Sequence, residues 1–197
     1  MLPTPYYDQD GITIYHGDCR EILPYLPKVD LVLTDPPYGI GMHLSNKRTK
    51  PSRPNSYKYY KDIKHYTSNW DDDRIEKPLL DAIFSISTNQ IIWGSNYYCS
   101  CLPEGFGWIF WNKLNGLNNC FSDGEFAFCS KGIQSRYFEC SQFRELRGGL
   151  DRQHPTQKPT QLMEWCINLF PDSQTILDPF MGSGTTLVAA KQLGRKA

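Results

Sequence analysis

A buried hydrophobic run that ends abruptly in an acid and two prolines is the feature that most constrains the fold. Residues 29–34 read VDLVLT, and such a run of mostly apolar, β-branched residues is typical of a strand in a parallel sheet. Asp35 is unsuited to a strand interior, and Pro36 and Pro37 lack the amide hydrogen that a sheet ladder needs. The strand is therefore expected to end here, in a rigid turn that presents a carboxylate, proline carbonyls and the Tyr38 ring. A simple strand exit with a capping aspartate is the alternative.

A second strand-to-turn stretch, ILDPFMGSGTTLVAA at 176–190, predicts a strand, a glycine loop and a helix. Gly182 and Gly184 permit a tight turn and let a ligand approach the backbone closely, and the free amides at a helix start favour a polar or negatively charged group. A phosphate-binding P-loop would need lysine after the last glycine, where Thr185 stands. A dinucleotide fingerprint would need a third glycine at Leu187. The loop therefore suits a nucleoside-type cofactor better, and a turn that binds nothing remains the alternative.

Strands and helices alternate along most of the chain, which predicts an α/β fold with a mainly parallel sheet. Asp73 and Glu76 have the spacing of a capping box at the start of one helix. Aromatic stretches in the second half of the chain are separated by turn residues and predict an antiparallel meander at one edge of the sheet. The strands are expected at 12–15, 29–34, 90–94, 107–111, 124–130, 135–140 and 174–178. The helices are expected at 17–26, after Asp73 with Ile75, Leu79, Ile83 and Ile86 on one face, from Pro159 onward, and at 185–193, closed by Gly194.

The composition limits the classes of protein that need to be considered. The chain of 197 residues fits one domain with a real core, and 21 basic residues balance 21 acidic ones, so the overall charge implies no polyanionic partner. No apolar run approaches membrane-spanning length and the first residues lack the features of a signal peptide, so a cytoplasmic protein is expected. Seven scattered cysteines without a Cys-x-x-Cys pair, and four dispersed histidines, predict reduced thiols and no metal site.

The two turn motifs together resemble a known family. DPPY at 35–38 and DPFMGSGTT at 178–186 resemble the catalytic and cofactor motifs of S-adenosylmethionine-dependent DNA amino-methyltransferases, and their order resembles the permuted β class. YHGDCREIL at 15–23 and HPTQKP at 154–159 are similar to further parts of that class. The resemblance implies a Rossmann-like, doubly wound class I methyltransferase fold, with one catalytic domain over 1–197. It also implies that the two motif-bearing strands are neighbours, so that both motifs meet beyond their carboxyl ends.

The resemblance implies methyl transfer from S-adenosylmethionine to the N6 amine of an adenine flipped out of double-stranded DNA. Aspartate at position 35 favours adenine, with cytosine-N4 transfer and a catalytically impaired DNA-binding remnant as alternatives. Asp35 and the main-chain carbonyl of Pro36 would accept from the target amine, Pro37 would help to hold that carbonyl still, and Tyr38 would stack on the base. The partners implied are double-stranded DNA and, beyond it, a second copy of the chain or a companion restriction endonuclease.

The same resemblance assigns a cofactor site. Asp18 would accept from the adenine amine of the cofactor, although a turn or helix-cap aspartate is nearly as well supported by the sequence. Lys158 would be a counter-charge for the cofactor carboxylate, or else a solvated loop lysine. The residues implied around the cofactor are Asp18, Cys19, Thr156, Gln157, Lys158, Asp178, Pro179, Phe180, Gly182, Ser183, Gly184 and Thr185.

The region 41–70 has no periodic pattern and carries a strong local charge. Between residues 47 and 64, seven basic residues stand against the single acid Asp62, with several tyrosines interleaved. Basic side chains suit phosphates and aromatic rings suit displaced bases, so this basic-aromatic loop is predicted to contact DNA. A solvated loop without a partner is the alternative. The residues expected at the DNA are Lys47, Arg48, Lys50, Arg53 and Lys58.

Target recognition and the C-terminal end depart from the family pattern. Residues 131–153 form a short target-recognition segment, too short for the separate domain that is common in the family, with Arg136, Arg144 and Arg147 as candidate DNA contacts. An acid that binds the ribose hydroxyls is expected about 20 residues after the glycine loop, and that position would lie beyond Ala197. The C-terminal strand and its acidic motif are thus expected to be missing. The chain is predicted to be a piece of a longer protein, with a shortened protein of impaired cofactor affinity as the alternative.

Overall fold

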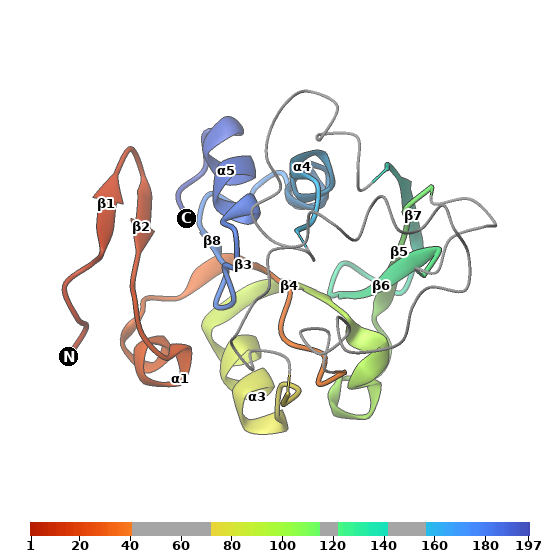
Figure 1. Ribbon diagram of the computed structural model, residues 1–197, viewed down its shortest axis with the longest axis horizontal. Helices are drawn as coiled ribbons and strands as arrows, with labels where there is room; N and C mark the ends of the chain where they lie inside the picture. The colour runs from red at the N-terminus through yellow and green to blue at the C-terminus, as the bar shows by residue number, and fades with distance from the viewer. Residues whose placement is uncertain (41–71, 115–121, 142–156) are drawn as a thin grey trace, which may run out of the picture.

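A six-stranded sheet forms the centre of the molecule in the computed structural model, which describes residues 1–40, 72–114, 122–141 and 157–197 (Figure 1). Helices cover both faces of this sheet. A short hairpin of β1 (Tyr7–Gln9) and β2 (Ile12–Ile14) lies beside it. The sheet strands, in spatial order, are β7 (Arg136–Glu139), β5 (Gly107–Asn112), β6 (Gly124–Cys129), β4 (Ser87–Trp93), β3 (Val29–Thr34) and β8 (Ile176–Leu177).

The helices of the described residues are short. None of them has the length and the apolar character that crossing a membrane requires. They are α1 (Cys19–Ile22), α3 (Lys77–Ile86), α4 (Thr160–Asn168) and α5 (Thr185–Gln192), with 3-10 turns after α1 (Leu23–Tyr25) and after β4 (Ser95–Tyr97).

The sheet is mainly parallel, as the sequence predicts. β4 and β8 both run parallel to β3, whereas β6 is antiparallel to its two neighbours, β4 and β5. The expected antiparallel meander is wrong in one respect, because β7 pairs in parallel with β5. The chain leaves β6 at the end where β5 begins, since Gly107 lies opposite Cys129, and it enters β7 at the same end. β7 therefore reverses the direction of β6 but lies on the far side of β5.

Alternate residues of β3 point to opposite faces of the sheet, so this strand contributes to two cores. Leu31 and Leu33 pack with residues of α4 and α5 on one face. Val32 packs with residues of α3 on the other face. Figure 1 shows α4 and α5 on one side of the sheet and α3 on the opposite side. The run VDLVLT is almost continuously apolar because both of its faces are covered.

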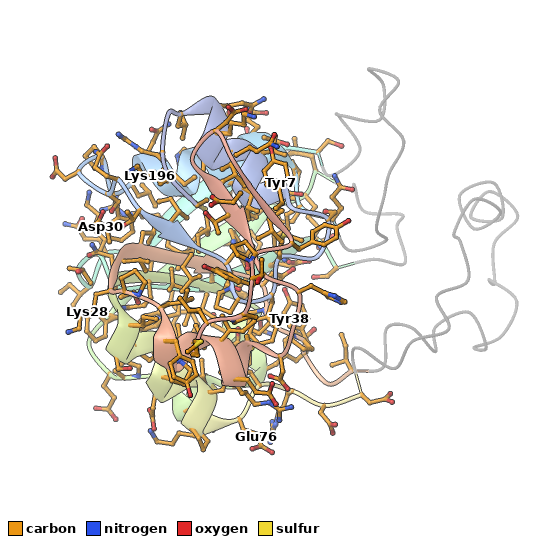
Figure 2. All side chains as sticks on the ribbon, turned by 90° about the vertical axis from the view of Figure 1, so that its left-hand side faces the viewer. Tyr7, Lys28, Asp30, Tyr38, Glu76 and Lys196 are labelled. Carbon is orange, nitrogen blue, oxygen red and sulfur yellow. The ribbon has the colours of Figure 1, made fainter. Side chains whose placement is uncertain are left out.

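Asp30, the charged residue of β3, ties the start of β8 to the start of β3. Its carboxylate accepts from the amides of Gln174 and Thr175, each at 2.9 Å, and from the Thr175 hydroxyl at 2.8 Å. These hydrogen bonds lower the pKa of Asp30, that from the Thr175 hydroxyl most of all. They fix β8 in position against β3. Figure 2 places Asp30 at the left and Tyr38, beyond the other end of β3, to its right.

Helix α3 begins three residues later than the capping-box spacing predicts. Its N-cap is Glu76, no side chain caps it, and Pro78 lies in its first turn. Asp73 and Glu76 therefore do not form the predicted capping box. Arg74 is held in an extended bridge with Tyr38, which keeps the chain out of the helix up to that point. The buried residues of the helix are Leu80, Ile83 and Ile86.

The last residues of the chain lie between β8 and the β1–β2 hairpin. Lys196 forms a parallel bridge with Thr175. The Ala197 amide donates to the Gly11 carbonyl at 3.0 Å, and the Thr13 amide donates to the Ala197 carbonyl at 2.7 Å. These residues lie beside β8, on the side where the family pattern has the C-terminal strand that is predicted to be missing from this chain. The strand predicted at 174–178 is shorter in the structure, where β8 has 2 residues.

Candidate active site

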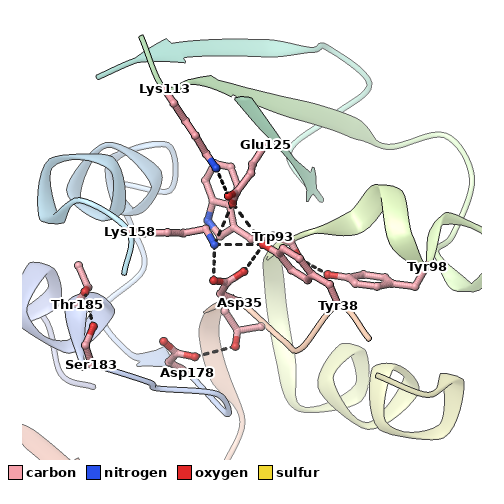
Figure 3. Close-up of polar contacts among 11 residues, drawn as sticks. Asp35, Tyr38, Trp93, Tyr98, Lys113, Glu125, Lys158, Asp178, Ser183 and Thr185 are labelled. Atoms are coloured by element: carbon pink, nitrogen blue, oxygen red, sulfur yellow. Dashed lines mark hydrogen bonds and ion pairs between the residues drawn. The ribbon is translucent and has the colours of Figure 1, made fainter. Parts of the chain in front are cut away.

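The two predicted turns lie side by side at the edge of the sheet where β3 and β8 end. Asp35 follows β3 and Asp178 follows β8, and the two strands are paired in parallel. The Thr34 hydroxyl donates to the Asp178 carboxylate at 2.7 Å, which links the last residue of one strand to the turn after the other (Figure 3). The expectation that the two motif-bearing strands are neighbours is confirmed. Parallel strands bring their carboxyl ends to the same edge, and ligands of such sheets bind there.

The Asp35 carboxylate is the centre of a cluster of charged side chains (Figure 3). The Lys158 ammonium forms an ion pair with one of its oxygens, and the Tyr38 hydroxyl donates to the other at 2.5 Å. The Lys158 ammonium also lies 3.1 Å from a Glu125 oxygen and 3.2 Å from the Tyr38 hydroxyl. The Lys158 side chain is 4% exposed. Its charge is thus removed from water and depends on these partners.

Glu125 and Lys113 complete this cluster. Glu125 lies near the start of β6, and Lys113 comes directly after β5, the strand that pairs with β6. The Lys113 ammonium lies 2.5 Å from one Glu125 oxygen, so the two oxygens of Glu125 face two different ammonium groups. The Trp111 ring lies 5.3 Å from the Lys113 ammonium, and the Trp93 ring lies 5.5 Å from the other ammonium. Two anions therefore alternate with two cations in a largely buried row.

Burial and charge act in opposite directions on the pKa values of this cluster. Burial raises the pKa of Asp35, and the Lys158 ammonium opposes the rise. Burial also disfavours the charged form of Glu125, but the ammonium groups of Lys158 and Lys113 outweigh it and lower the pKa of Glu125 to about 2. Burial lowers the pKa of Lys158, and the two carboxylates outweigh this and raise it. Glu125 is therefore ionised and Lys158 is protonated near neutral pH.

The Tyr38 ring is held between the catalytic turn and the residues that follow β4. It stacks on the Tyr97 ring, with centroids 4.8 Å apart and planes at 19°. Gly94, the first residue after β4, has a φ of 71°, and a Cβ atom there would lie 1.9 Å from Tyr38 Cε1. Glycine alone fits this position without a shift of the ring. The ring predicted to stack on a base thus has an aromatic neighbour, Tyr97, which is itself 37% exposed.

The glycine loop leaves open space above its backbone. Gly182 and Gly184 have φ values of 54° and 78°, in the left-handed region. A Cβ atom at Gly184 would meet no heavy atom of the described residues within 4 Å. Glycine is therefore required there by the turn conformation and not by crowding from that part of the chain. The Ser183 and Thr185 hydroxyls lie 3.2 Å apart at the start of α5. The loop can therefore receive a ligand close to its main chain.

Asp178 is a half-buried carboxylate at the base of this loop. It accepts from the Thr34 hydroxyl, from the Phe180 amide at 3.1 Å and from the Thr186 hydroxyl. Burial nevertheless raises its pKa to about 6, and the negative charge of Asp35 adds to the rise. A cationic group bound beside Asp178 would favour its ionised form.

A cavity of about 120 Å³ joins the segment that follows β2 to the glycine loop. Three of the predicted cofactor residues contribute to its walls, and much of the remaining lining is apolar. The lining includes Cys19, Asp178 and Pro179 from the predicted set, together with Met181 and Ala197. Residues far apart in the sequence thus share one small hollow beside the Asp178 turn.

Asp18 is the N-cap of helix α1, which is the second of the two roles expected for it from the sequence. Its carboxylate accepts from the Arg20 amide at 2.9 Å at the start of α1, and it pairs with the Arg20 guanidinium at 2.5 Å. The hydrogen bonds from Arg20 lower the pKa of Asp18. Asp18 lines a separate, open hollow of about 520 Å³ near the first residues of the chain. Its contact with a cofactor stays a prediction.

The structure describes only some of the other predicted site residues. Gln157 and Lys158 lie just before α4, and the ammonium of Lys158 contacts the catalytic cluster, so its contact with a cofactor carboxylate stays a prediction. Arg136 begins β7, at the edge of the sheet remote from β3. The residues that lie outside the described ranges are Thr156, Lys47, Arg48, Lys50, Arg53, Lys58, Arg144 and Arg147.

Four residues of the site are not predicted from the sequence: Gly94, Tyr97, Lys113 and Glu125. Lys113 and Glu125 belong to aromatic, β-rich stretches whose pattern predicts only packing. Gly94 had a usable signal, because it belongs to the strand predicted at 90–94 and a glycine in a strand often marks a close approach of two segments. That signal could point to a turn, and it could not identify Tyr38 as the neighbour. No such signal marks Tyr97.

The chain is similar to known proteins along nearly its whole length. A family model described as DNA methylase matches residues 46–197. The type II methyltransferase M2.LlaDCHI of Lactococcus lactis subsp. cremoris is 28% identical over 236 residues, which cover 100% of this chain and 86% of that protein. The type II methyltransferase M.ScaI of Streptomyces caespitosus is 26% identical over 238 residues, which cover 98% of this chain and 78% of that protein. The crystal structure of an M1.HpyAVI–SAM complex has a TM-score of 0.54 at 23% identity, over 94% of this chain and 90% of that one, and this likeness confirms the predicted fold class.

Proposed function

The chain belongs to the DNA methylase family, and we propose that it transfers a methyl group from S-adenosylmethionine to the exocyclic N6 amine of an adenine flipped out of double-stranded DNA. The observation that carries this proposal is the meeting of two turns at one sheet edge, with Asp35 and Asp178 on either side of Thr34. One turn offers acceptors for an amine. The other opens onto a cavity with a partly apolar lining.

An exocyclic amine is a weak nucleophile because its lone pair is delocalised into the ring of the base. Asp35 accepts one N–H of the amine and the Pro36 carbonyl accepts the other, which favours a tetrahedral nitrogen with a localised lone pair. Pro36 and Pro37 have fixed φ angles, so that carbonyl is held still. Acceptors held in place in a water-poor site act through preorganised electrostatics, which is usually the largest contribution to catalysis. The Asp35 carboxylate also stabilises the positive charge that develops on the nitrogen.

The residues around the glycine loop fit S-adenosylmethionine, which supplies an electrophilic methyl group on sulfur when it is bound. The apolar lining of the cavity beside Cys19 suits an adenosine ring system, and the Asp178 carboxylate suits an ammonium group. The open backbone at Gly182 and Gly184 allows a ligand to lie against the main chain. Methyl transfer forms the nitrogen–carbon bond as the carbon–sulfur bond breaks with its electrons on sulfur. The surplus proton of the amine passes to Asp35 or to water.

Incubation with isotope-labelled S-adenosylmethionine and unmethylated genomic DNA, followed by digestion to nucleosides, tests this proposal. Labelled N6-methyladenine is the expected product. Labelled N4-methylcytosine would support the cytosine alternative. DNA binding without any labelled base would contradict the transfer and favour a remnant that only binds DNA.

Asp35→Ala is expected to abolish labelling and to leave cofactor binding nearly intact, because Asp35 does not line the cavity of the glycine loop. Equilibrium dialysis with labelled cofactor measures the binding. Asp81→Ala removes an exposed carboxylate on α3, paired with Lys77, and is the matched control with unchanged labelling. Equal losses of binding and transfer in Asp35→Ala would argue against an acceptor role for this residue.

Both relatives named above are type II methyltransferases, and on this likeness we infer that a restriction endonuclease shares the target site of this protein. DNA methylated by the protein is then expected to resist one type II endonuclease that cleaves the unmethylated DNA. Resistance to none of a broad panel would contradict this inference. A second copy of the chain as a partner stays a prediction.

A further inference from the structure

In the structure, the Asp35 carboxylate is engaged on both of its oxygens. Tyr38 donates to Oδ1 at 2.5 Å, and the Lys158 ammonium is paired with Oδ2. A carboxylate in a buried ion pair is a weaker acceptor for an incoming amine, because part of its charge is already neutralised. An ammonium group beside the amine also opposes the positive charge that develops on the reacting nitrogen. The proposed transfer is therefore favoured when Lys158 moves away from Asp35.

Glu125 is placed to receive that ammonium group. Its Oε2 atom lies 3.1 Å from Lys158 Nζ, so a small rotation of the lysine side chain exchanges one carboxylate for the other. Lys113 lies 2.5 Å from Oε1 of Glu125, and Oε2 faces both Lys158 and the Tyr38 hydroxyl, which is 3.3 Å away. The two ammonium groups lower the pKa of Glu125 to about 2 against the effect of burial, so Glu125 keeps its charge at neutral pH.

The charge balance of the cluster permits this exchange inside a buried site. Asp35 and Glu125 carry two negative charges, and Lys113 and Lys158 carry two positive charges. A shift of Lys158 toward Glu125 changes no protonation state. After the shift, Lys158 is paired with Glu125, and Asp35 accepts from the target amine. Every buried ion therefore keeps a partner, which matters because a buried ion without one is costly.

We propose that Glu125 is a positioning residue, which takes over the Lys158 ammonium when the target amine binds and so frees Asp35 to accept from that amine. The inference rests on the methyl transfer proposed above. Glu125 acts on the reaction through Lys158, and Lys113 holds Glu125 in place for this purpose.

Glu125→Gln tests the inference, because it removes the charge and keeps the shape of the side chain. Asp35 then remains as the carboxylate partner of Lys158, and the ion pair between them tightens. The kcat for methyl transfer is expected to fall by about tenfold or more, while the KM values for cofactor and DNA stay within about threefold. The KM for cofactor is expected to stay nearly constant because Glu125 does not line the cavity of the glycine loop.

The pH profile of kcat separates this role from a merely structural one. Asp35 must be ionised to accept, so the rate falls as the pH drops through its pKa, which the charge of Glu125 raises. Removal of the Glu125 charge is expected to move the acidic limb of the kcat profile, where kcat falls with falling pH, to lower pH. The plateau value of kcat at higher pH is also expected to be lower. A variant that only folds poorly loses rate at every pH without such a shift. The other groups that face Asp35 are Lys158, Tyr38, Tyr98 and Asp178.

The kcat profiles are measured at saturating cofactor. Asp178, whose pKa is about 6, then titrates in the same way in the wild-type protein and in the Glu125 variants. Glu104→Gln makes the same change at an exposed residue shortly before β5 and is the matched control, with wild-type kcat and profile. If Glu125→Gln does not fold, Glu125→Asp serves in its place. It draws the carboxylate back by one methylene, and a lower kcat with a smaller shift of the acidic limb is expected.

Wild-type kcat in the Glu125 variant, or a lower kcat with an unmoved acidic limb, overturns the inference. A lower plateau with the limb at lower pH supports it. A wild-type protein that methylates no DNA overturns the proposed function, and this inference with it. The two failures are distinct, because the second is seen before any variant is made.

Discussion

Gly94, the first residue after β4, packs against Tyr38 of the catalytic turn at a very tight point of the site, and its replacement by alanine tests the geometry there. Its φ is 71°, and an added Cβ atom would lie 1.9 Å from Tyr38 Cε1 and 2.4 Å from Tyr38 Cδ1. A non-glycine residue in the left-handed region costs about 1–2 kcal/mol, and overpacking of a well-packed site costs about 1–3 kcal/mol. Gly94→Ala is therefore expected to lower the free energy of unfolding by about 2–5 kcal/mol.

Gly105→Ala separates the two contributions. Gly105 has a φ of 79°, and a Cβ atom there would meet no heavy atom within 4 Å among the residues that the structure describes. It has the backbone strain of Gly94 without the crowding, so a loss of about 1–2 kcal/mol is expected. Urea unfolding followed by tryptophan fluorescence measures both variants, since Trp93 and Trp111 are buried next to the site. Equal losses in the two variants would refute the argument from crowding against Tyr38.

The activity of Gly94→Ala extends the same test. The Tyr38 ring must move to admit the new methyl group, and its hydroxyl then loses the hydrogen bond to Asp35. Methyl transfer, measured at a temperature where both variants are folded, is expected to be clearly lower for Gly94→Ala than for Gly105→Ala. Wild-type turnover in folded Gly94→Ala would show that the position of Tyr38 does not matter for the reaction.

Two further predictions concern the cofactor and the DNA. Burial raises the pKa of Asp178 to about 6, and this carboxylate must be ionised to hold an ammonium group, so cofactor affinity is expected to fall as the pH drops through 6 in calorimetric titrations. Asp178→Asn is expected to weaken binding by about tenfold or more at pH 8 and to remove this pH dependence. Deletion of residues 47–64, with their seven basic side chains, is expected to weaken DNA binding and to flatten its dependence on salt concentration. An unchanged salt slope would remove this segment from the interface.

Local chemistry explains why the ends of the two site-bearing strands can be predicted. Pro36 and Pro37 cannot take part in a sheet ladder, so β3 ends where the sequence predicts. Gly184 has a positive φ, which the residue type itself favours, so the start of α5 at Thr185 is also predicted. Each of these signals belongs to one residue and its nearest neighbours. None depends on where the rest of the chain lies.

Tertiary contacts explain the predictions that were wrong. Asp73 and Glu76 have the spacing of a capping box, but the bridge between Arg74 and Tyr38 holds the chain extended at that point. β7 has the composition of a meander strand, but it pairs with β5 because β6 already lies between β4 and β5. In both cases a contact with a distant segment outweighs a local preference of a few tenths to about 1 kcal/mol.

The sequence by itself determined the fold class, the two turns and the acids that open them, because proline, glycine and aspartate restrict the backbone wherever they stand. Only the tertiary structure decided which charges meet. Lys158 contacts Asp35 and Glu125 because α4, β3 and β6 bring three distant segments to one edge of the sheet. Ion pairs act over a few ångströms and carry no signature in residue spacing, so the row of charges around Asp35 becomes visible only once the chain is folded.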